Sequence, residues 1–259
     1  IGAAVPIVVH RDRPDHIQYA GTTLHFLCEA ANPWLDRPLS DRPPGIIDIG
    51  TAAGVTLLLN VGAARHVGGF DARYFMGKED GEFCYRLRLA GYRIVESSDA
   101  IVRHGSRPRS TWLFPYQVRN RWHFMLKNYS GRTLLVLAPA LLVHEFVQIA
   151  ALAAKGELRA WGRGLRGLAA MTATLGADRR EVARLRRLGD REILTGGALT
   201  VRPDLVGRGV GAVLKRLYDQ GLALYWRLAR PLLGSGSRQG RRTSSSRRCR
   251  PAVRRSWSC

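Results

Sequence analysis

The sequence predicts an α/β domain over residues 1–130, a helical region over residues 131–233 and a disordered basic tail over residues 234–259. Three observations lead to this division. Short β-type runs alternate with loops and helices in the first part. Long apolar stretches rich in arginine follow, and the last 26 residues are mostly Gly, Ser and Arg. A composition of 46% hydrophobic and 24% charged residues is typical of a globular protein.

The first part contains four apolar runs that we expect to be strands and one short helical segment. The strands are expected at residues 6–10, 46–49, 55–59 and 92–95, and the short helix at residues 61–66, ended by Gly68 and Gly69. A long connection rich in Pro and Gly separates the first two strands. Connections of that length often carry function.

A second helix is predicted over residues 79–90, closed by the glycine that follows it. Phe83 and Leu87 recur at a spacing of four, so that face is expected to pack inward. Glu79 and Asp80 therefore lie in the first turn of the helix, where the helix dipole favours carboxylates.

Residues 133–154 are mostly apolar, and the stretch has about the length needed to cross a bilayer. However, Pro139, His144, Glu145 and Gln148 interrupt it. A central Glu costs a few kcal/mol or more in hydrocarbon. We therefore expect an interfacial or re-entrant helix in preference to a clean membrane span.

Two further helical stretches, residues 158–188 and 205–233, mix apolar residues with many arginines. The second has the pattern of a basic amphipathic helix. Either it lies on a membrane surface or it packs on its own domain with a solvated basic face, and the sequence leaves both alternatives open. The tail after it has too little apolar content to offset the entropy of ordering and is expected to be disordered.

The formal net charge of +21 predicts attraction to phosphate groups of any origin, including nucleic acid, anionic lipid and phosphorylated substrates. Eight arginines and no acidic residue fall in the tail. The four cysteines show no CxxC spacing, which argues against a zinc site and against a disulfide framework.

The most informative segment reads GGFDARYFMGKED from Gly68 to Asp80, followed by FCYRLRLAGY from Phe83 to Tyr92. It resembles the GGFDERFF…EDxDLCxRLxxAGY signature of inverting family 2 glycosyltransferases, especially the rhamnosyltransferase-like and galactofuranosyltransferase-like branch. The resemblance implies a partial glycosyltransferase A (GT-A, Rossmann-like) domain, followed by a membrane-associating helical region. It covers several spaced features and is more specific than any single dipeptide.

The resemblance implies catalytic roles for the two carboxylates. Asp80 would be the base that takes the proton from the acceptor hydroxyl, and Glu79 would bind or orient the acceptor. The chemistry agrees, because inverting sugar transfer needs a carboxylate to accept that proton. The alternative is that Glu79 and Asp80 only complement the helix dipole.

Further site residues follow from the same resemblance. Gly54 falls at the glycine of the family's preceding strand, and Tyr116 and Arg119 match a "YxxRNr" segment after the core. We assign Gly54 and Tyr116 to acceptor binding and Arg119, with Arg103, to the phosphates of the donor.

His104 ends a predicted strand 24 residues after Asp80. In relatives a histidine so placed helps to bind the metal, and neutral imidazole suits Mn²⁺-like ions. A hydrogen-bonding surface histidine is the alternative. Arg103, like Arg107 and Arg109, is either a phosphate ligand or part of the general basic surface.

The family's Asp-x-Asp element, whose carboxylates hold the metal on the leaving diphosphate, is absent from the sequence. Residues 1–21 resemble the family segment that follows that element. We therefore expect the donor-binding part, with its divalent metal (Mg²⁺ or Mn²⁺) and nucleotide-sugar, to lie outside this chain. An exposed sheet edge is expected beside residues 6–10.

The expected function is that of an inverting glycosyltransferase, or of its acceptor-side fragment. It would transfer a sugar from a nucleotide-sugar donor to a glycan or lipid-linked acceptor in cell-wall or surface-polysaccharide biosynthesis. The expected place is the cytoplasmic face of the cell membrane, with an anionic membrane surface as partner. The alternatives are a basic nucleic-acid-binding protein, although no specific nucleic-acid motif is present, and a non-catalytic membrane-associated partner that kept the fold.

Overall fold

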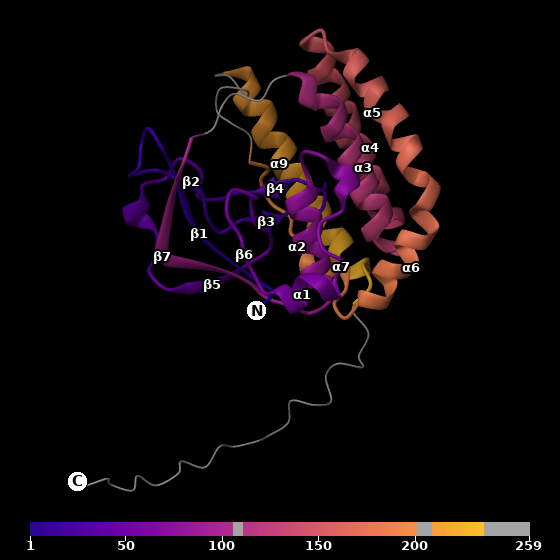
Figure 1. The fold of residues 1–259 in the computed structure, drawn as a ribbon. Coiled ribbons are helices and arrows are strands. Elements are labelled where there is room, and N and C mark those ends of the chain that lie inside the picture. The colour runs from indigo at the N-terminus through magenta and orange to yellow at the C-terminus, as the bar shows by residue number, and fades with distance from the viewer. Residues whose placement is uncertain (106–110, 201–208, 236–259) are drawn as a thin grey trace, which may run out of the picture.

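The structure, a computed structural model, describes residues 1–105, 111–200 and 209–235. It is a mixed α/β fold with a curled sheet on one side and a group of helices on the other, with α2 (Glu79–Leu89) between them (Figure 1). The prediction of an α/β part followed by helices is confirmed. The basic tail, with Cys249 and Cys259, lies outside the described residues apart from its first two positions.

The main sheet is built around one parallel pair of strands. Its strands are β1 (Ala3–His10), β2 (Ile17–Tyr19), β5 (Ile46–Ile49), β6 (Leu58–Leu59) and β7 (Ile94–His104). Their order is β2-β1-β7-β5. β6 also pairs with β1, on the same side of β1 as β2 and opposite to β7. Only β1 and β7 run parallel, and the register between them shifts after Pro6, leaving residues 98–100 of β7 without partners on β1. A separate hairpin pairs β3 (Thr23–Leu24) with β4 (Ala30–Ala31).

The expectation of an exposed edge beside residues 6–10 is wrong. β1 lies inside the sheet, because β7 pairs with it along its whole length and β2 and β6 pair with its other side. β2 and β5 are the strands at the two ends of this order, and β5, which has no second partner strand among the described residues, leaves Ile46 67% exposed. The sequence misplaced the edge because residues 17–19 form too short a strand to show a period, and the run predicted at residues 55–59 did not show which strand it would pair with.

The helices are α1 (Val61–His66), α2 (Glu79–Leu89), α3 (Phe114–Asn128), α4 (Gly131–Ala154), α5 (Leu158–Met171), α6 (Leu175–Leu185), α7 (Asp190–Ile193) and α9 (Val210–Ala229), with short 3-10 turns between some of them. The helices α1, α2 and α4 lie close to their predicted positions, the predicted stretch 158–188 divides into α5 and α6, and α3 was not predicted. α2 ends as expected, with Gly91 at a φ of 85° after it. α4 begins at Ser130, whose hydroxyl accepts the Thr133 N–H.

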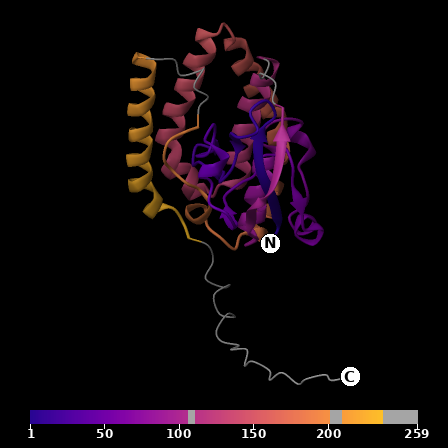
Figure 2. The same cartoon turned by 90° about the vertical axis from the view of Figure 1, so that its left-hand side faces the viewer.

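The helical part and the α/β part share one core. Phe26 from the β3–β4 hairpin, Tyr85 of α2 and Trp226 of α9 are buried in the same cluster, which also includes residues of α3, α4 and α6. Phe26 and Trp226 stack with ring centroids 5.2 Å apart. A second cluster lies between α1, α2 and the sheet, where Phe83 and Leu87 are fully buried as expected. Figures 1 and 2 show α9 lying along α4 on the outside of this assembly.

Candidate active site at the start of α2

Asp80 lies in the first turn of α2 and faces the loop that contains Gly54. Its Oδ2 accepts the backbone N–H of Gly54 at 2.8 Å, and its Oδ1 accepts the N–H of Gly81 at 2.7 Å. Both Asp80 and its neighbour Glu79 are half-buried. Each oxygen of an ionised carboxylate has two lone-pair positions, so Asp80 keeps acceptor capacity beyond these two bonds.

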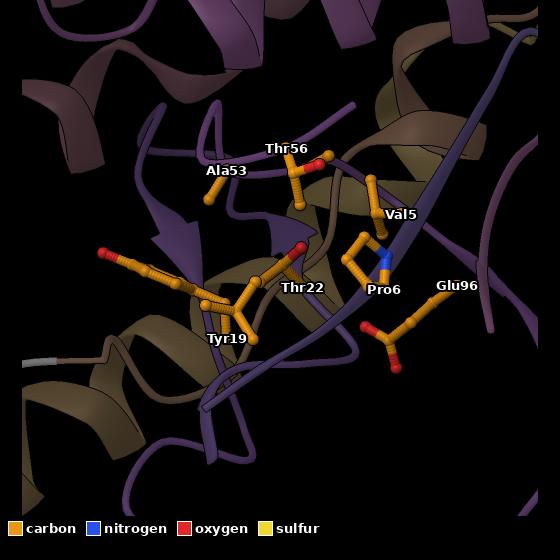
Figure 3. Close-up of a pocket in the computed structure, with 9 residues that line it drawn as sticks. Val5, Pro6, Tyr19, Thr22, Ala53, Thr56 and Glu96 are labelled. Atoms are coloured by element: carbon orange, nitrogen blue, oxygen red, sulfur yellow. The ribbon is translucent and has the colours of Figure 1, made fainter. Parts of the chain in front are cut away.

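The Gly54 loop borders a small cavity on the sheet, drawn in Figure 3. Its volume is about 10 Å³, on the scale of one water molecule. Side chains from β1, β2, β7 and two loops line it: Val5, Pro6, Val8, Tyr19, Thr22, Ala52, Ala53, Thr56 and Glu96. Because Ala53 directly precedes Gly54, the hydrogen bond to Asp80 connects the wall of this cavity to the start of α2.

Glu96 is the charged residue of the cavity wall, and it is almost fully buried. Its Oε2 accepts the N–H of Gly21 at 2.7 Å, and its Oε1 accepts the guanidinium of Arg42 at 2.5 Å. Arg42 in turn lies over the Trp34 ring, 4.9 Å from its centroid. The carboxylate is therefore paired and held in place, which suits a positioning role better than proton transfer.

The loop that leads into α2 has an uncommon backbone. Phe75, Gly77 and Lys78 all have positive φ angles, of 57°, 85° and 75°. Such angles cost energy at residues with a Cβ, and they persist where the surroundings enforce them. They place the first turn of α2, and with it Asp80, directly after a tight reversal of the chain.

Two neighbouring side chains of α3 hold this loop. Arg119 Nη2 donates to the carbonyls of Arg73 and Tyr74, both at 3.0 Å. Asn120 Nδ2 lies 2.7 Å from the carbonyl of Gly77 and within 3.0 Å of those of Tyr74 and Met76. The "RN" pair of the predicted segment therefore binds the backbone in front of α2.

Lys78 fixes the same loop from the other side. Its Nζ donates to the carbonyl of Cys28 at 2.7 Å and to Glu29 Oε2 at 2.6 Å. Burial opposes ionisation of Glu29, but Lys78, His144 and Arg121 together outweigh it and hold the pKa of that carboxyl well below its usual range. Glu29 also lies 4.0 Å from His144 of α4.

A buried charge network lies beneath the loop. Glu82 Oε1 lies 2.8 Å from Arg86 Nε and 3.0 Å from Lys127 Nζ. Lys127 also binds Asp71 at 2.7 Å, and Asp71 binds Arg73 at 2.6 Å. Burial raises the pKa of Asp71, but hydrogen bonds from Arg73 and Lys127 dominate and hold it below its usual range. Most charged residues of the GGFDARYF segment and of the α2 face are thus used to fix its shape.

The other predicted site residues lie in different surroundings. His104 Nδ1 donates to Gln18 Oε1 on β2 at 2.8 Å, and Arg103 before it is exposed. Arg107 and Arg109 lie outside the described residues. Tyr116 is half-buried between Phe75 and Trp112, with ring centroids 5.3 and 5.9 Å away. The structure thus brings Gly54 together with Asp80, and Tyr116 and Arg119 to the loop before α2, whereas His104 contacts β2.

The predicted metal role of His104 would require further metal-binding side chains near it. Within residues 1–105, 111–200 and 209–235, no three or more His, Cys, Asp or Glu side chains gather where they could hold a metal ion. These residues therefore do not make up a metal site by themselves, and no step proposed below passes through a metal.

Three residues that shape the site were missed in the sequence: Lys78, Glu96 and Asn120. Glu96 had a detectable signal, since a charged residue inside an apolar strand requires a partner. Lys78 and Asn120 had none beyond their place in the motifs, because their bonds go to backbone carbonyls that are distant in sequence.

No family model matches this sequence, and no curated protein matches it. The resemblance of residues 68–92 to family 2 glycosyltransferases therefore stays a prediction. The geometry adds a half-buried carboxylate at a helix start, next to a loop of enforced conformation and to the wall of a small cavity.

Proposed function

We propose that this chain is the acceptor-side part of an inverting glycosyltransferase, with Asp80 as the general base. The observation that carries the proposal is the position of Asp80. It is half-buried at the start of α2, oriented by the Gly54 N–H, and preceded by a loop that Arg119, Asn120 and Lys78 clamp. A backbone conformation that several surrounding bonds enforce in this way is typical of functional sites.

In the proposed step, a hydroxyl of the acceptor glycan attacks the anomeric carbon of the donor sugar. The new glycosidic C–O bond forms as the bond to the diphosphate breaks, and the diphosphate leaves with the electron pair. Asp80 takes the hydroxyl proton, because it has free acceptor positions besides its two backbone bonds. Glu79, adjacent and half-buried, would orient the acceptor.

The donor side of the reaction is assigned to a segment outside the described residues. The chain has no Asp-x-Asp element, so the nucleotide-sugar and the Mg²⁺ or Mn²⁺ ion that the resemblance implies would be held elsewhere. Arg119 donates to the loop before α2 through its Nη2 and to Asn120 Oδ1 through its Nε, which favours a positioning role over direct binding of phosphate.

The nucleic-acid alternative receives less support from the aromatic residues. Trp122 and Trp161 both donate their indole N–H to Glu145, and Trp226 is buried against Phe26. These rings are engaged inside the fold and are not available to stack on bases.

The test is Asp80→Asn, which removes the proton acceptor and keeps the shape. Transfer is measured as nucleoside diphosphate release, with a panel of nucleotide-sugars and glycan acceptors, in the chain fused after a segment that supplies the Asp-x-Asp element. We expect kcat to fall by about two to four orders of magnitude with little change in donor KM. Glu79→Gln should mainly raise the acceptor KM.

The matched control is Asp99→Asn, which neutralises an exposed carboxylate on β7 and should leave kcat unchanged. Near wild-type turnover of Asp80→Asn, with an unchanged pH profile, would reduce Asp80 to a helix-dipole residue. If the wild-type fusion released no diphosphate with any pair of substrates, while binding acceptor glycans in saturation-transfer NMR, a non-catalytic glycan-binding role would replace the proposal.

A further inference from the structure

α4 (Gly131–Ala154) is oriented with the polar residues of its central turns inward and large apolar residues outward. In its central turns, His144 and Glu145 are buried. Leu135 and Phe146, by contrast, are 77% and 70% exposed, and Leu142, Val143 and Val147 are exposed as well. A helix that borders water has the opposite distribution, with its polar residues on the outer face.

The inward residues Glu145 and His144 form hydrogen bonds to other helices, and these bonds fix the orientation of α4. Glu145 receives the guanidinium of Arg121 from α3 and the indole N–H groups of Trp122 at 2.9 Å and Trp161 at 2.6 Å. His144 binds the hydroxyl of Tyr218 on α9 at 2.8 Å. Rotating α4 to hide its leucines would expose these bonds and leave Arg121 buried without its partner.

α9 (Val210–Ala229) continues the apolar outer surface. It runs antiparallel to α4, because Tyr225 donates to the Val136 carbonyl at 2.5 Å while Tyr218 meets His144 further along α4. Its outward leucines recur at spacings of three, four and seven: Leu214, Leu217, Leu224 and Leu228. In Figure 2 the two helices lie side by side on the outside of the molecule.

Exposed basic residues lie on α4, on α9 and on α5, which contacts α4, and exposed acidic residues do not. Eight cations on α4, α5, α9 and their ends are exposed: Arg132, Lys155, Arg159, Arg163, Arg166, Arg216, Arg227 and Arg230. In the described parts of the same segments, 131–171 and 209–235, the acidic residues are Glu145, Glu157 and Asp219, and none of them is exposed. This combination of an apolar stripe and a basic rim matches an anionic lipid surface.

We propose that the outer faces of α4 and α9 bind an anionic bilayer, with both helices in the plane of the membrane and their apolar side chains inserted. We call this surface the α4–α9 face, represented by Leu135, Leu142 and Phe146 of α4 and Leu217, Leu224 and Leu228 of α9. α4 has 24 residues, and an 18-residue window within it has a mean hydropathy of 1.9, so it satisfies a membrane span equally well. The bonds from α4 to α3 and α9 favour the in-plane arrangement, because they keep one side of α4 on the protein.

A second copy of the chain fits this face less well than lipid. A symmetric dimer places the same patch on both sides of the interface. It would therefore bring two sets of eight exposed cations together with no exposed acid between them, which opposes association. Anionic headgroups would instead neutralise the rim while the acyl region covers the leucines.

The experiment is co-sedimentation of the full chain with phosphatidylcholine vesicles that do or do not contain phosphatidylglycerol. We expect binding to the anionic vesicles that weakens as salt rises. The double variant Leu135→Gln/Phe146→Gln should lower the partition coefficient by about ten-fold or more, because two inserted apolar side chains are lost. Arg216→Gln/Arg227→Gln should lower it by a smaller factor and reduce its salt dependence.

The matched control is Leu58→Gln on β6, which lies away from the α4–α9 face and whose leucine is 76% exposed, like the 77% of Leu135. It should bind vesicles as the wild type does. The arginine-rich tail is present in every variant, so its contribution cancels in the comparison.

Two results would overturn the proposal. One is equal vesicle binding by the wild type and by Leu135→Gln/Phe146→Gln. The other is a loss of dimer or higher oligomer in the double variant, measured by light scattering without lipid, together with no vesicle binding by the wild type; the face would then be an interface between copies. The proposal deepens the proposed function by locating its acceptor. However, vesicle binding is measured without sugar transfer, so either can fail alone.

Discussion

Two buried glutamates pack against α3, and they have different effects on the molecule. Glu82 of α2 is fully buried and pairs with two cations, Arg86 and Lys127. Glu145 of α4 is 7% exposed and pairs with Arg121 and two indole N–H groups. The first fixes the shape of a loop, since Arg86 also binds the carbonyls of Val67 and Gly69. The second fixes which face of a helix points outward.

The comparison separates two uses of buried charge. A buried ion pair contributes little net stability relative to an apolar pair of the same size, but breaking it is costly. Such pairs therefore serve mainly to exclude other arrangements. Around Glu82 the excluded arrangements are other paths of residues 67–73, and around Glu145 they are other rotations of α4.

The largest expected effect is that of Glu82→Gln. It leaves Arg86 and Lys127 facing a neutral group in a dry environment, so the free energy of unfolding should fall by about 3–5 kcal/mol. Urea titration followed by circular dichroism measures this. Asp48→Asn removes an exposed pair with Arg93 and should cost about 1 kcal/mol or less. Equal losses in the two variants would show that burial does not distinguish the networks.

Glu145→Gln should destabilise the fold less, by about 2–3 kcal/mol. Only one cation, Arg121, loses its partner, and the amide oxygen can still accept a bond from Trp122 or Trp161. The same urea titration measures the change, with Glu157→Gln, at the half-buried residue that precedes α5, as control. A loss larger than that of Glu82→Gln would reverse the ranking of the two networks.

The smallest expected effect is the loss of unfolding free energy at acidic pH. Burial lowers the pKa of His123 from 6.5 to about 4, helped by Arg73 and Lys127, and burial likewise lowers that of His25 to about 4. Both are neutral in the fold, and the unfolded chain takes up protons first as pH falls below 6.5. Stability is therefore fully present above that pH and is lost toward pH 4, by about 1–2 kcal/mol per histidine between pH 6.5 and 5.

Unfolding free energies of the wild type, His123→Gln and His25→Gln at these two pH values test this. Each variant should reduce the change in unfolding free energy between these two pH values by about 1–2 kcal/mol, the contribution of the one histidine that it removes. Because His123 contacts Tyr74 and His25 contacts the carbonyl of Gly197, the two variants report on different contacts. An unchanged slope in both would mean that neither ring is protonated on unfolding.

Much of the fold was predictable because its elements carry local patterns. The bounds of α1 and β5 were predicted to the residue, and α2 was predicted with its inward face and closing glycine, since the apolar spacing and Gly91 define them. α3 was not predicted as a helix. It is buried on several sides and carries Arg119, Asn120 and Arg121 where an amphipathic pattern would have apolar residues.

The site was predictable only in part. The motif placed Asp80 at the start of α2, and its resemblance marked Gly54, which the structure joins to Asp80. The clamps on the loop could not be predicted, because Lys78, Arg119 and Asn120 bind backbone carbonyls, and a carbonyl leaves no mark in the sequence. The inward orientation of Glu145 was likewise set by a partner 24 residues away, Arg121.

One short stretch of α3 connects the two networks. Arg119 and Asn120 hold the loop in front of Asp80, Arg121 and Trp122 hold α4, and His123 meets Tyr74. This turn cannot rotate or slide without breaking bonds in both directions. The fold therefore fixes the distance between the Asp80 carboxylate and the outer helices α4 and α9. For an acceptor anchored in a bilayer under the α4–α9 face, the length of the spacer between lipid and reacting hydroxyl would decide whether that hydroxyl reaches Asp80.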